Sequence, residues 1–436
     1  MNIFELMHER FVLPSKPRLF ESFSGIGCQR MAFDRLGIEY EMVGISEIDK
    51  YAIKSYMAIH GDTKNFGSIT DIKGDDLPQI DVFTYSFPCT DLSKAGKQKG
   101  LSKTRSGLVY EVLRILHELH KQNRLPKVLI MENVVDLVQT KFIREFQEIQ
   151  VELESMGYTN YTQTLNAKEY GVAQNRDRVF MVSILGDYYY EFPKPIPLEK
   201  RLKDYLESEV DEKYYLSDSF IATMYKDSGK FNRAERFEQS THKDVEDAIG
   251  FTITSRAGGR PTDNFISVPE ATDKGYAEAF VGDSVSLEFP NSKTRRGRVG
   301  KQIAQTLTCQ TELGVVVNEF FSPNVLTPKR TEHGKEVRKK YENGLHEESR
   351  HTMTKLTPRD DEISNALTTV QKDNMLLEPS LRIRKLTPLE CWRLMGIDDK
   401  DFHKASQVCS NAQLYKQAGN GIVVDVFAKI IERMAR

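Results

Sequence analysis

Apolar residues between positions 18 and 185 follow two alternating periods. Short runs rich in β-branched and aromatic residues alternate with longer stretches that carry an apolar face at helical spacing. The runs expected to be strands are Arg18–Phe23, Met42–Glu47, Ile80–Ser86, Lys127–Glu132 and Arg178–Leu185. The stretches expected to be helices are Cys28–Leu36, Asp49–Ile59, Gly107–Lys121 and Lys141–Met156. This alternation predicts an α/β sheet with covered faces, in which functional residues gather where strands end.

The pattern weakens after the segment Phe192–Pro197, whose three prolines make a stiff connector and mark a domain boundary. From there to Pro379 the apolar runs are short, which indicates a β-rich domain with long loops. Three pairs of runs resemble one another, and each pair is either two strands around a polar turn or a chance likeness of Thr-rich strands. The pairs are Phe251–Thr254 with Asn264–Val268, Gln305–Thr308 with Leu313–Val317, and Asn365–Thr369 with Asn374–Leu377.

Helical signals return near the C-terminus. Thr387–Glu390 has the pattern of a capping box with Pro388 at the first helical position, and it predicts a helix through Leu394. A second amphipathic helix is expected over Gly421–Met434.

Composition narrows the class of protein. The chain has 436 residues, of which 39% are apolar and 28% charged, as in an ordinary soluble protein of two or three domains. No stretch approaches the ~18 apolar residues of a membrane span. Met1–Arg18 lacks the apolar core of a signal peptide, so we do not expect secretion. The net charge is -2, so any binding of nucleic acid must come from local basic patches.

Five cysteines are present, and no two stand at the C-x-x-C spacing of a zinc knuckle; they are Cys28, Cys89, Cys309, Cys391 and Cys409. Their odd number indicates free thiols in a reducing cytoplasm. We therefore expect no structural metal.

A glycine-rich turn follows the first expected strand. Gly25 and Gly27 allow the backbone to approach a ligand without a Cβ in the way. Ser46–Asp49 ends the next strand with acids, about twenty residues later, which is the layout of a nucleoside ribose site. An ordinary strand–helix turn with a solvated acid fits the same pattern.

Cys89 follows Pro88 at the end of the third expected strand. A cysteine in this position is most often an inert core residue. The next residues change this interpretation, because five basic residues and three glycines follow without an acid among them: Lys94, Lys97, Lys99, Lys103 and Arg105, with Gly96, Gly100 and Gly107. A basic glycine-containing loop beside a thiol is typical of a nucleophile that is approached by a polyanion.

Glu132 stands at the end of the fourth strand, either as a solvated cap or as a buried acid that holds a proton. Arg176 and Arg178 precede the fifth strand, and on an extended segment they would point the same way and share one anion or carbonyl. A surface ion pair with Asp177 is the alternative. Together, these strand ends predict a nucleotide-cofactor enzyme with a cysteine nucleophile that acts on a polyanion.

The chain resembles the C5-cytosine-specific DNA methyltransferases over Arg18–Leu185 and Leu381–Arg436. The matching blocks occur in family order: Phe23-x-Gly25-x-Gly27, Glu47-Ile48-Asp49, Phe87-Pro88-Cys89, Glu132-Asn133-Val134, Gln174-x-Arg176-x-Arg178, Arg384–Ile397 and Gly419-Asn420-Gly421. The resemblance implies a Rossmann-like, S-adenosylmethionine-dependent core with a smaller, β-rich target-recognition domain. Residues 1–190 and 381–436 would form the catalytic domain, and residues 191–380 would recognise the target.

The resemblance also implies a mechanism. Cys89 would add to C6 of a cytosine flipped out of duplex DNA. Glu132 would hold the proton on N3, and Arg178 would hold O2 while Arg176 braces the site. C5 would then take the methyl group of S-adenosylmethionine, giving S-adenosylhomocysteine, with no metal involved.

For the cofactor, the family pattern places the glycine turn around methionine and adenosine, Glu47 at the ribose and Ile48 on the adenine. The other implied cofactor residues are Phe23, Gly25, Ile26, Gly27, Ser68, Ile69, Pro88 and Asn420. The chain departs from the family where Gly67-Ser68-Ile69 replaces the usual Gly-Asp-Ile; either Ser68 or the nearby Asp71 would then contact the adenine amino group. Thr90 replaces a common glutamine, which leaves that DNA contact in doubt.

Several residues are expected to contact DNA: Ser93, Lys97, Lys99, Arg105, Gln174, Arg295, Arg296 and Arg298. The last three belong to Lys293–Arg298, the strongest basic cluster of the middle segment. This cluster either reads guanine edges, contacts phosphates only, or is a solvated loop.

The expected partner is double-stranded DNA, bound by a monomer in the cytoplasm at the nucleoid. A cognate restriction endonuclease, where one exists, would act separately, and the source would be a bacterium or a phage. An RNA (tRNA) cytosine-5 methyltransferase with a related core is the alternative, but it would not need the long segment between Phe192 and Leu381. A catalytically dead relative would be expected to lack Cys89 or Glu132, and both are present.

Overall fold

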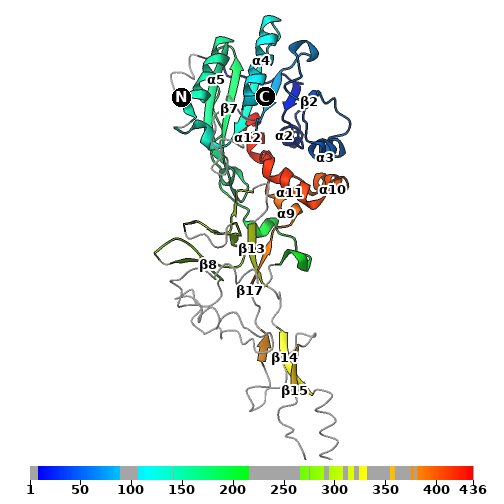
Figure 1. Ribbon diagram of the computed structural model, residues 1–436, viewed down its shortest axis with the longest axis vertical. Helices are drawn as coiled ribbons and strands as arrows, with labels where there is room; N and C mark the ends of the chain where they lie inside the picture. The colour runs from blue at the N-terminus through cyan, green and yellow to red at the C-terminus, as the bar shows by residue number, and fades with distance from the viewer. Residues whose placement is uncertain are drawn as a thin grey trace, which may run out of the picture. The chain divides into compact units, whose positions relative to one another are not determined.

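The computed structural model describes residues 8–88, 107–140, 142–215, 266–273, 275–288, 294–307, 313–318, 324–330, 354–358, 375–377 and 381–435. The chain divides into two compact units. The first comprises Met1–Tyr214, Gly300–Gly314 and Lys385–Arg436, and the second comprises Tyr215–Val299 and Val315–Arg384. Figure 1 labels their main helices and strands.

The first unit is built on a six-stranded sheet with the order β2-β1-β3-β4-β7-β5. Strands β2 and β7 of this sheet are labelled in Figure 1. Its strands are β1 (Arg18–Ser22), β2 (Glu41–Ser46), β3 (Val82–Tyr85), β4 (Val128–Asn133), β5 (Tyr158–Asn166) and β7 (Asp177–Leu185). The first four are parallel, whereas β7 is antiparallel to both β4 and β5. All residues of β3 and β4 are buried, as expected for central parallel strands. The ends of β1 to β4 and the start of β7 therefore lie at one edge of the sheet.

Four helices connect these strands: α2 (Cys28–Leu36), α3 (Lys50–His60), α4 (Leu108–Lys121) and α5 (Ile143–Ser155). Apolar side chains of α4 and α5 share one core with sheet residues such as Phe83 and Leu129. All the predicted strands and helices of this region are confirmed, with ends within two residues of those expected. The prediction missed β5, because its middle is polar and partly exposed at the edge of the sheet.

The C-terminal segment completes the first unit with α9 (Pro388–Arg393), α10 (Asp399–Ser406), α11 (Asn411–Asn420) and α12 (Val424–Glu432). α10 lies against α3, and α12 lies against α2. The capping box and the last amphipathic helix are confirmed as α9 and α12. α10 and α11 were not predicted, because their sequences are largely polar.

The described part of the second unit contains short strands in several sheets. A four-stranded sheet has the order β11-β10-β13-β17, and a three-stranded sheet has the order β15-β14-β16. The strands are β8 (Ile266–Pro269), β9 (Tyr276–Ala279), β10 (Ser284–Ser286), β11 (Val299–Gly300), β13 (Leu313–Asn318), β14 (Asn324–Arg330), β15 (Thr354–Pro358), β16 (Met375–Leu377) and β17 (Leu381–Lys385). The β-rich character expected of this segment is thus seen in its described residues from Ile266 onwards, whereas its first described part contains the short 3-10 turns Leu202–Tyr205 and Glu212–Tyr214.

The predicted repeat does not produce a hairpin in its middle copy. β12 (Ala304–Gln305) pairs with β6 (Gln174–Asn175) in the first unit, whereas β13 pairs with β10 and β17. Local likeness between Thr-rich runs does not determine which strands pair, because pairing is decided by distant partners. The first halves of the other two copies lie outside the described residues. Among the helices that are described, none is long and apolar enough to cross a membrane.

Candidate active site

The glycine turn after β1 has a backbone that few residues can adopt. Phe23, Gly25 and Gly27 have φ values of 54°, 56° and 83°. Gly27 precedes the first residue of α2, and a Cβ there would lie 2.5 Å from the His60 Nε2 atom. The turn is closed by the Gly27 amide, which donates to the Ser24 carbonyl at 2.9 Å. The sequence therefore places main-chain groups, not side chains, at the end of β1.

The Glu47 carboxylate lies just after β2 and binds three backbone amides at this edge of the sheet. It accepts hydrogen bonds from the amides of Gly25 at 2.9 Å and of Ile48 and Asp49 at 2.7 Å each. A carboxylate has about four acceptor positions, so one remains for a ribose hydroxyl. The Asp49 carboxylate caps α3 by accepting hydrogen bonds from the amides of Tyr51 and Ala52. It also forms an ion pair with Lys416 of α11.

Ile48 is 72% exposed, which is unusual for a large apolar side chain at a strand end. It stands directly after the ribose candidate Glu47, where an adenine face would cover it. The free acceptor position, the exposed isoleucine and the open glycine turn fit an adenosyl cofactor at this edge of the sheet.

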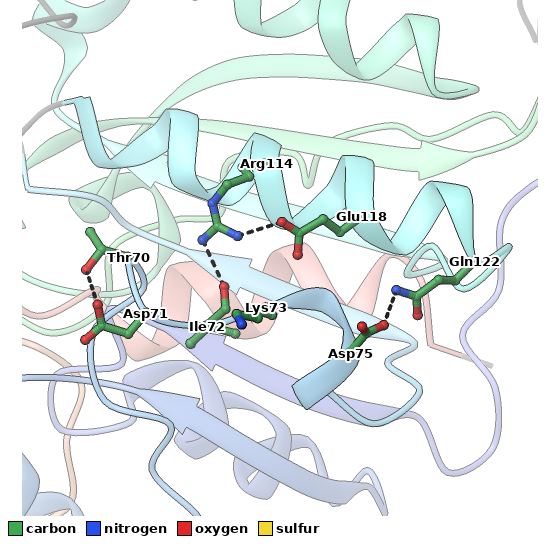
Figure 2. A pocket seen from close by; sticks show the side chains of 8 residues that line it. All are labelled: Thr70, Asp71, Ile72, Lys73, Asp75, Arg114, Glu118 and Gln122. Carbon is green, nitrogen blue, oxygen red and sulfur yellow. Dashed lines mark hydrogen bonds and ion pairs between the residues drawn. The ribbon is translucent and has the colours of Figure 1, made fainter.

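The loop from Ser68 to Gly74 contributes the remaining predicted cofactor residues of this region. The Ile69 side chain is buried, and the Ser68 side chain is partly exposed. A hollow of about 350 Å³ lies between this loop and α4, as Figure 2 shows; it is lined by Thr70, Asp71, Ile72, Lys73, Asp75, Arg114, Glu118 and Gln122. Neither Glu47 nor Ile48 lines it, so we do not assign the cofactor to this hollow.

Behind the glycine turn lies a buried polar cluster that sequence reasoning missed. Glu21 of β1 accepts hydrogen bonds from the Tyr56 hydroxyl and the Arg30 amide, both at 2.8 Å. Burial raises the pKa of Glu21 to about 7, although these hydrogen bonds oppose the rise. Burial also lowers the pKa of His60 to about 3, so the ring is neutral and its Nε2–H donates to the Ile26 carbonyl at 3.0 Å. The only signal in the sequence was an acid within an apolar strand.

Glu132 and Arg178 meet at the same edge of the sheet. The antiparallel register pairs Glu132 with Phe180, and alternation along β7 places Arg178 on the same side as Phe180. Arg178 Nε lies 3.0 Å from Glu132 Oε1, which is buried and has no aligned hydrogen bond within the described part of the chain. Glu132 is therefore a buried acid, not a solvated cap.

Arg176 has different partners from Arg178, because the extended segment is interrupted between β6 and β7. Its guanidinium is buried and donates to the carbonyls of Leu307, Gly419 and Gly421 at 2.9–3.0 Å. The expectation that the two arginines share one partner is wrong. Arg176 instead holds the backbone on both sides of Asn420, whose own side chain is exposed at the end of α11.

Gln174 was expected to contact DNA, yet its side chain is fully buried. Its Nε2 donates to the Leu394 carbonyl at 2.6 Å, and its Oε1 accepts from the Leu307 amide at 3.3 Å. The side chain therefore joins three distant segments of the first unit and is not available to contact DNA.

Cys89, Ser93, Lys97, Lys99 and Arg105 lie outside the described residues, as do Thr90 and Lys293. The approach to Cys89 is described up to Pro88, which is partly buried. Just before it, the Phe87 carbonyl accepts a hydrogen bond from the Asn133 side chain at 3.3 Å. The chain thus leaves β3 beside the end of β4, next to Glu132.

In the second unit, the three arginines of the basic cluster differ. Arg298 is buried and donates to the carbonyls of Pro269 and Ser286 at 3.1 and 3.0 Å. Arg295 is paired with Glu288 at 2.5 Å. Arg296 is exposed and donates to the Ala271 carbonyl at 2.8 Å. The burial of Arg298 conflicts with its expected DNA contact, because its guanidinium satisfies the backbone of its own unit.

Comparisons with known proteins identify the family of the chain. Residues 18–436 match the family model described as C-5 cytosine-specific DNA methylase. The orphan methyltransferase M.SPRI of Bacillus phage SPR is 30% identical over 465 residues, which cover 96% of this chain and 97% of that protein. The type II methyltransferase M2.ScrFI of Lactococcus lactis subsp. cremoris is 29% identical, with 96% of this chain and 98% of that protein covered.

Solved structures show the same fold. The Dnmt2 methyltransferase of S. pombe superposes with a TM-score of 0.54 at 17% identity, over 96% of this chain and 98% of that one. The α/β sheet is therefore the Rossmann-like fold of S-adenosylmethionine-dependent methyltransferases. Because the family model spans nearly the whole sequence, the chain belongs to the C-5 cytosine-specific DNA methylases and is a DNA cytosine methyltransferase.

Proposed function

We propose that the chain methylates C5 of a cytosine flipped out of a specific duplex DNA site, through a covalent bond between Cys89 and C6 of the base. The observation that carries the proposal is the pair formed by Glu132 and Arg178, 3.0 Å apart, at the sheet edge where the chain continues to Cys89. N3 and O2 are neighbouring atoms on one edge of cytosine. Two polar groups at this separation suit those two atoms.

Cysteine addition solves the main chemical difficulty, which is that C5 of cytosine is a weak nucleophile. The Cys89 thiolate would form a bond to C6, and the electron pair of the C5–C6 double bond would become available at C5. Glu132, protonated, would hold N3, and Arg178 would stabilise the charge at O2. After C5 is methylated, loss of its proton re-forms the double bond and expels Cys89 as thiolate.

S-adenosylmethionine, when bound, supplies an electrophilic methyl group. Glu47 would accept a ribose hydroxyl, Ile48 would pack on the adenine, and the turn from Phe23 to Gly27 would lie against the rest of the cofactor. Ser68, Ile69, Pro88 and Asn420 would complete the site. A base stacked in a duplex cannot reach Cys89, so the target must leave the helix.

The domain assignment follows from this proposal. Residues 1–190 and 381–436 would carry catalysis, and residues 191–380 would recognise the DNA sequence. Within the described part of the recognition segment, Arg296 and Arg295 are the candidates for contact with DNA. Ser93, Lys97, Lys99 and Arg105 would contact the strand that carries the flipped base.

We further propose a monomer that acts on chromosomal or phage DNA in the cytoplasm. Both orphan and type II methyltransferases occur among the relatives, so a separate restriction endonuclease is one of two biological settings. Bisulfite sequencing of DNA from cells that express the chain would identify the methylated site. Parallel assays with labelled cofactor on duplex DNA and on transfer RNA would distinguish the RNA alternative.

Covalent trapping tests the nucleophile. A duplex with 5-fluorocytosine at the target cannot lose a C5 proton, so the wild type should remain attached to it through Cys89. Cys89→Ser should give no adduct and no methylation while binding DNA. Cys28 and Cys391 are poor alternatives, because burial raises the pKa of both thiols, that of Cys28 to about 12.

Cys409 is the appropriate control, since it is only partly buried. Cys409→Ser should still form the adduct. Peptide mapping by mass spectrometry would identify the attached residue, and an adduct on any cysteine other than Cys89 would refute the proposal.

A further inference from the structure

Glu21 holds the glycine turn from behind. α2 begins at Cys28, and its cap residue Gly27 has no side chain that could accept a hydrogen bond from the helix. Glu21 of β1 provides that acceptor instead, because its Oε1 atom accepts from the Arg30 amide at 2.8 Å. Arg30 is the third residue of α2, about 4.5 Å along the helix axis from Gly27. The carboxylate therefore lies close behind the turn.

Methyl transfer removes one positive charge from the cofactor, because the sulfonium of S-adenosylmethionine becomes the neutral thioether of S-adenosylhomocysteine. Resting on the proposed placement of the cofactor at the glycine turn, we propose that the ionised Glu21 carboxylate distinguishes S-adenosylmethionine from its product by attracting the sulfonium charge. Glu21 is fully buried, so it acts through space and without touching the ligand. Its charge favours binding of the cofactor and release of the product.

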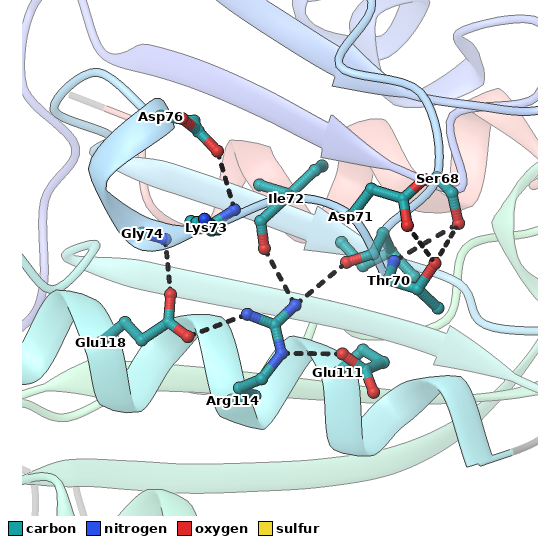
Figure 3. A network of polar contacts seen from close by, with 11 residues as sticks. Ser68, Thr70, Asp71, Ile72, Lys73, Gly74, Asp76, Glu111, Arg114 and Glu118 are labelled. Atoms are coloured by element: carbon teal, nitrogen blue, oxygen red, sulfur yellow. Dashed lines mark hydrogen bonds and ion pairs between the residues drawn. The ribbon is translucent and has the colours of Figure 1, made fainter.

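Burial allows this charge to act over a distance, because solvent screens a buried charge only weakly. Even about 10 Å apart, two unit charges at an effective dielectric constant of about 20 change an affinity by about tenfold. An acid of α4 gives the contrast. Figure 3 shows Glu118, which pairs with Arg114 at 2.9 Å and accepts from the Gly74 amide at 2.6 Å. Its side chain is 34% exposed, so its charge is both neutralised and screened.

The titratable and charged groups that face Glu21 are Arg30, Asp34 and Cys28 of α2 and Tyr56 of α3. The Tyr56 hydroxyl donates to Glu21 Oε2 at 2.8 Å. Burial raises the pKa of Glu21 to about 7, although the hydrogen bonds from Tyr56 and Arg30 oppose the rise. Burial also raises the pKa of Cys28 to about 12 and that of Tyr56 above its ordinary value, so both stay neutral where Glu21 titrates.

The ionisation of Glu21 makes the discrimination depend on pH. At low pH the side chain is protonated, and both ligands meet a neutral group. A cation at the turn stabilises the ionised form, so the preference for S-adenosylmethionine should rise as the pH increases up to and through 7. His60 does not contribute to this rise, because burial lowers its pKa to about 3 and the ring stays neutral.

Isothermal titration calorimetry on the full chain without DNA gives the dissociation constants of both ligands. The preference is the constant for S-adenosylhomocysteine divided by that for S-adenosylmethionine. Dividing the wild-type preference by that of Glu21→Gln cancels the titration of the ligands and of other protein groups. This quotient should be about one near pH 5.5 and about ten near pH 8. A quotient of about one at both pH values would overturn the proposal.

Tyr56→Phe keeps the ring beside the turn and removes one hydrogen bond to the Glu21 carboxylate. This loss disfavours the ionised form, so the rise in preference should move to higher pH. Damage to the fold would weaken both ligands together and cancel from their ratio. A Tyr56→Phe protein whose preference rises at the wild-type pH would contradict the assignment to Glu21.

Glu39→Gln is the matched control, because Glu39 is an exposed acid. Its preference should follow that of wild type at every pH, and a loss of the rise in this variant would count against Glu21. Wild type that shows the expected rise but never methylates DNA would refute the proposed reaction and support the discrimination. Wild type that binds neither ligand would refute both.

Discussion

Glu132 is buried at the end of β4, with its Oε1 atom 3.0 Å from Arg178 Nε, and we propose that it acts as an acid. Glu132→Gln keeps the shape of the side chain but removes the acidic proton of the carboxyl group. Turnover should fall on the order of 10²–10⁴-fold, as expected for loss of general acid catalysis. Affinity for S-adenosylmethionine should stay within a few-fold. Single-turnover kinetics and calorimetry measure the two quantities, and unchanged turnover would remove Glu132 from the mechanism.

Glu21 provides a pH test of the cluster behind the glycine turn. Its pKa is raised to about 7 in the folded chain from an ordinary value of 4.5, so the folded state binds the proton more tightly. The stabilisation is complete below pH 4.5 and is lost as the pH rises through 7. His60 acts in the opposite sense, because its pKa is lowered from 6.5 to about 3 and stability falls as the pH drops through that range.

A variant that mimics the protonated acid isolates the Glu21 contribution. Glu21→Gln should match wild type near pH 4.5 and exceed it by on the order of 3 kcal/mol above pH 7, from a pKa shift of about 2.5. Urea unfolding at several pH values measures the difference. Glu39→Gln, at an exposed acid, should show none of this pH dependence. A constant difference between Glu21→Gln and wild type would contradict the burial argument.

The site residues whose positions could be predicted from the sequence are those fixed by the local backbone conformation. Glu47 and Ile48 follow β2, and the glycines need positive φ, so their positions follow from the strand and turn pattern alone. The roles of Gln174 and Arg176 could not be predicted, because their partners at Leu307, Leu394 and Gly419 lie more than 100 residues away. Local periodicity contains no information on such contacts.

Among the helices, α9 begins with a reciprocal cap. Thr387 Oγ1 accepts from the Glu390 amide at 3.2 Å, and the Glu390 carboxylate accepts from the Thr387 amide at 2.8 Å. Thr387 Oγ1 also donates to the Glu207 carboxylate. Thr387→Ala should therefore cost about 1–2 kcal/mol of unfolding free energy.

Ser410 offers the comparison for this cap. It occupies the same position before α11, yet its side chain makes no capping hydrogen bond. Ser410→Ala should change stability by only a few tenths of a kcal/mol, since no such bond is lost. Equal effects of the two substitutions in urea unfolding would show that the cap on α9 contributes nothing specific.

The same contrast explains which elements sequence predicted. α9 carries its start signal in the residues themselves, and α4 and α12 carry strong apolar faces. α10 and α11 are held in place by contacts with other elements. In α11, for example, the Lys416 ammonium forms an ion pair with Asp49 at 2.6 Å. Short polar helices of this kind take most of their stability from tertiary contacts.

At the scale of the whole molecule, the first unit is assembled from three separate stretches of chain. Arg176 joins all three, because it lies in the first stretch and donates to the carbonyls of Leu307 in the second and Gly419 in the third. The Leu386 amide also donates to the Leu313 carbonyl at 3.1 Å. Contacts of this kind allow the second unit to interrupt the sequence of the first without dividing the core of the first unit.

The arginines of the second unit test the proposal that residues 191–380 recognise DNA. Arg296 is exposed, so Arg296→Ala should weaken DNA binding; if it reads a guanine, the loss should be about 1–3 kcal/mol and confined to one base position. If it contacts only phosphate, affinity should fall evenly across sequences and the salt dependence should become shallower.

Arg298→Ala should behave differently, because this guanidinium is buried among main-chain carbonyls. Its loss should destabilise the second unit by a few kcal/mol, since buried acceptors lose their donor. Arg295→Ala should weaken DNA binding less than Arg296→Ala does, because Glu288 already neutralises the charge of Arg295 at 2.5 Å. Affinities for cognate and singly substituted duplexes at several salt concentrations, together with urea unfolding, separate these roles. Unchanged DNA affinity in all three variants would place recognition elsewhere in residues 191–380.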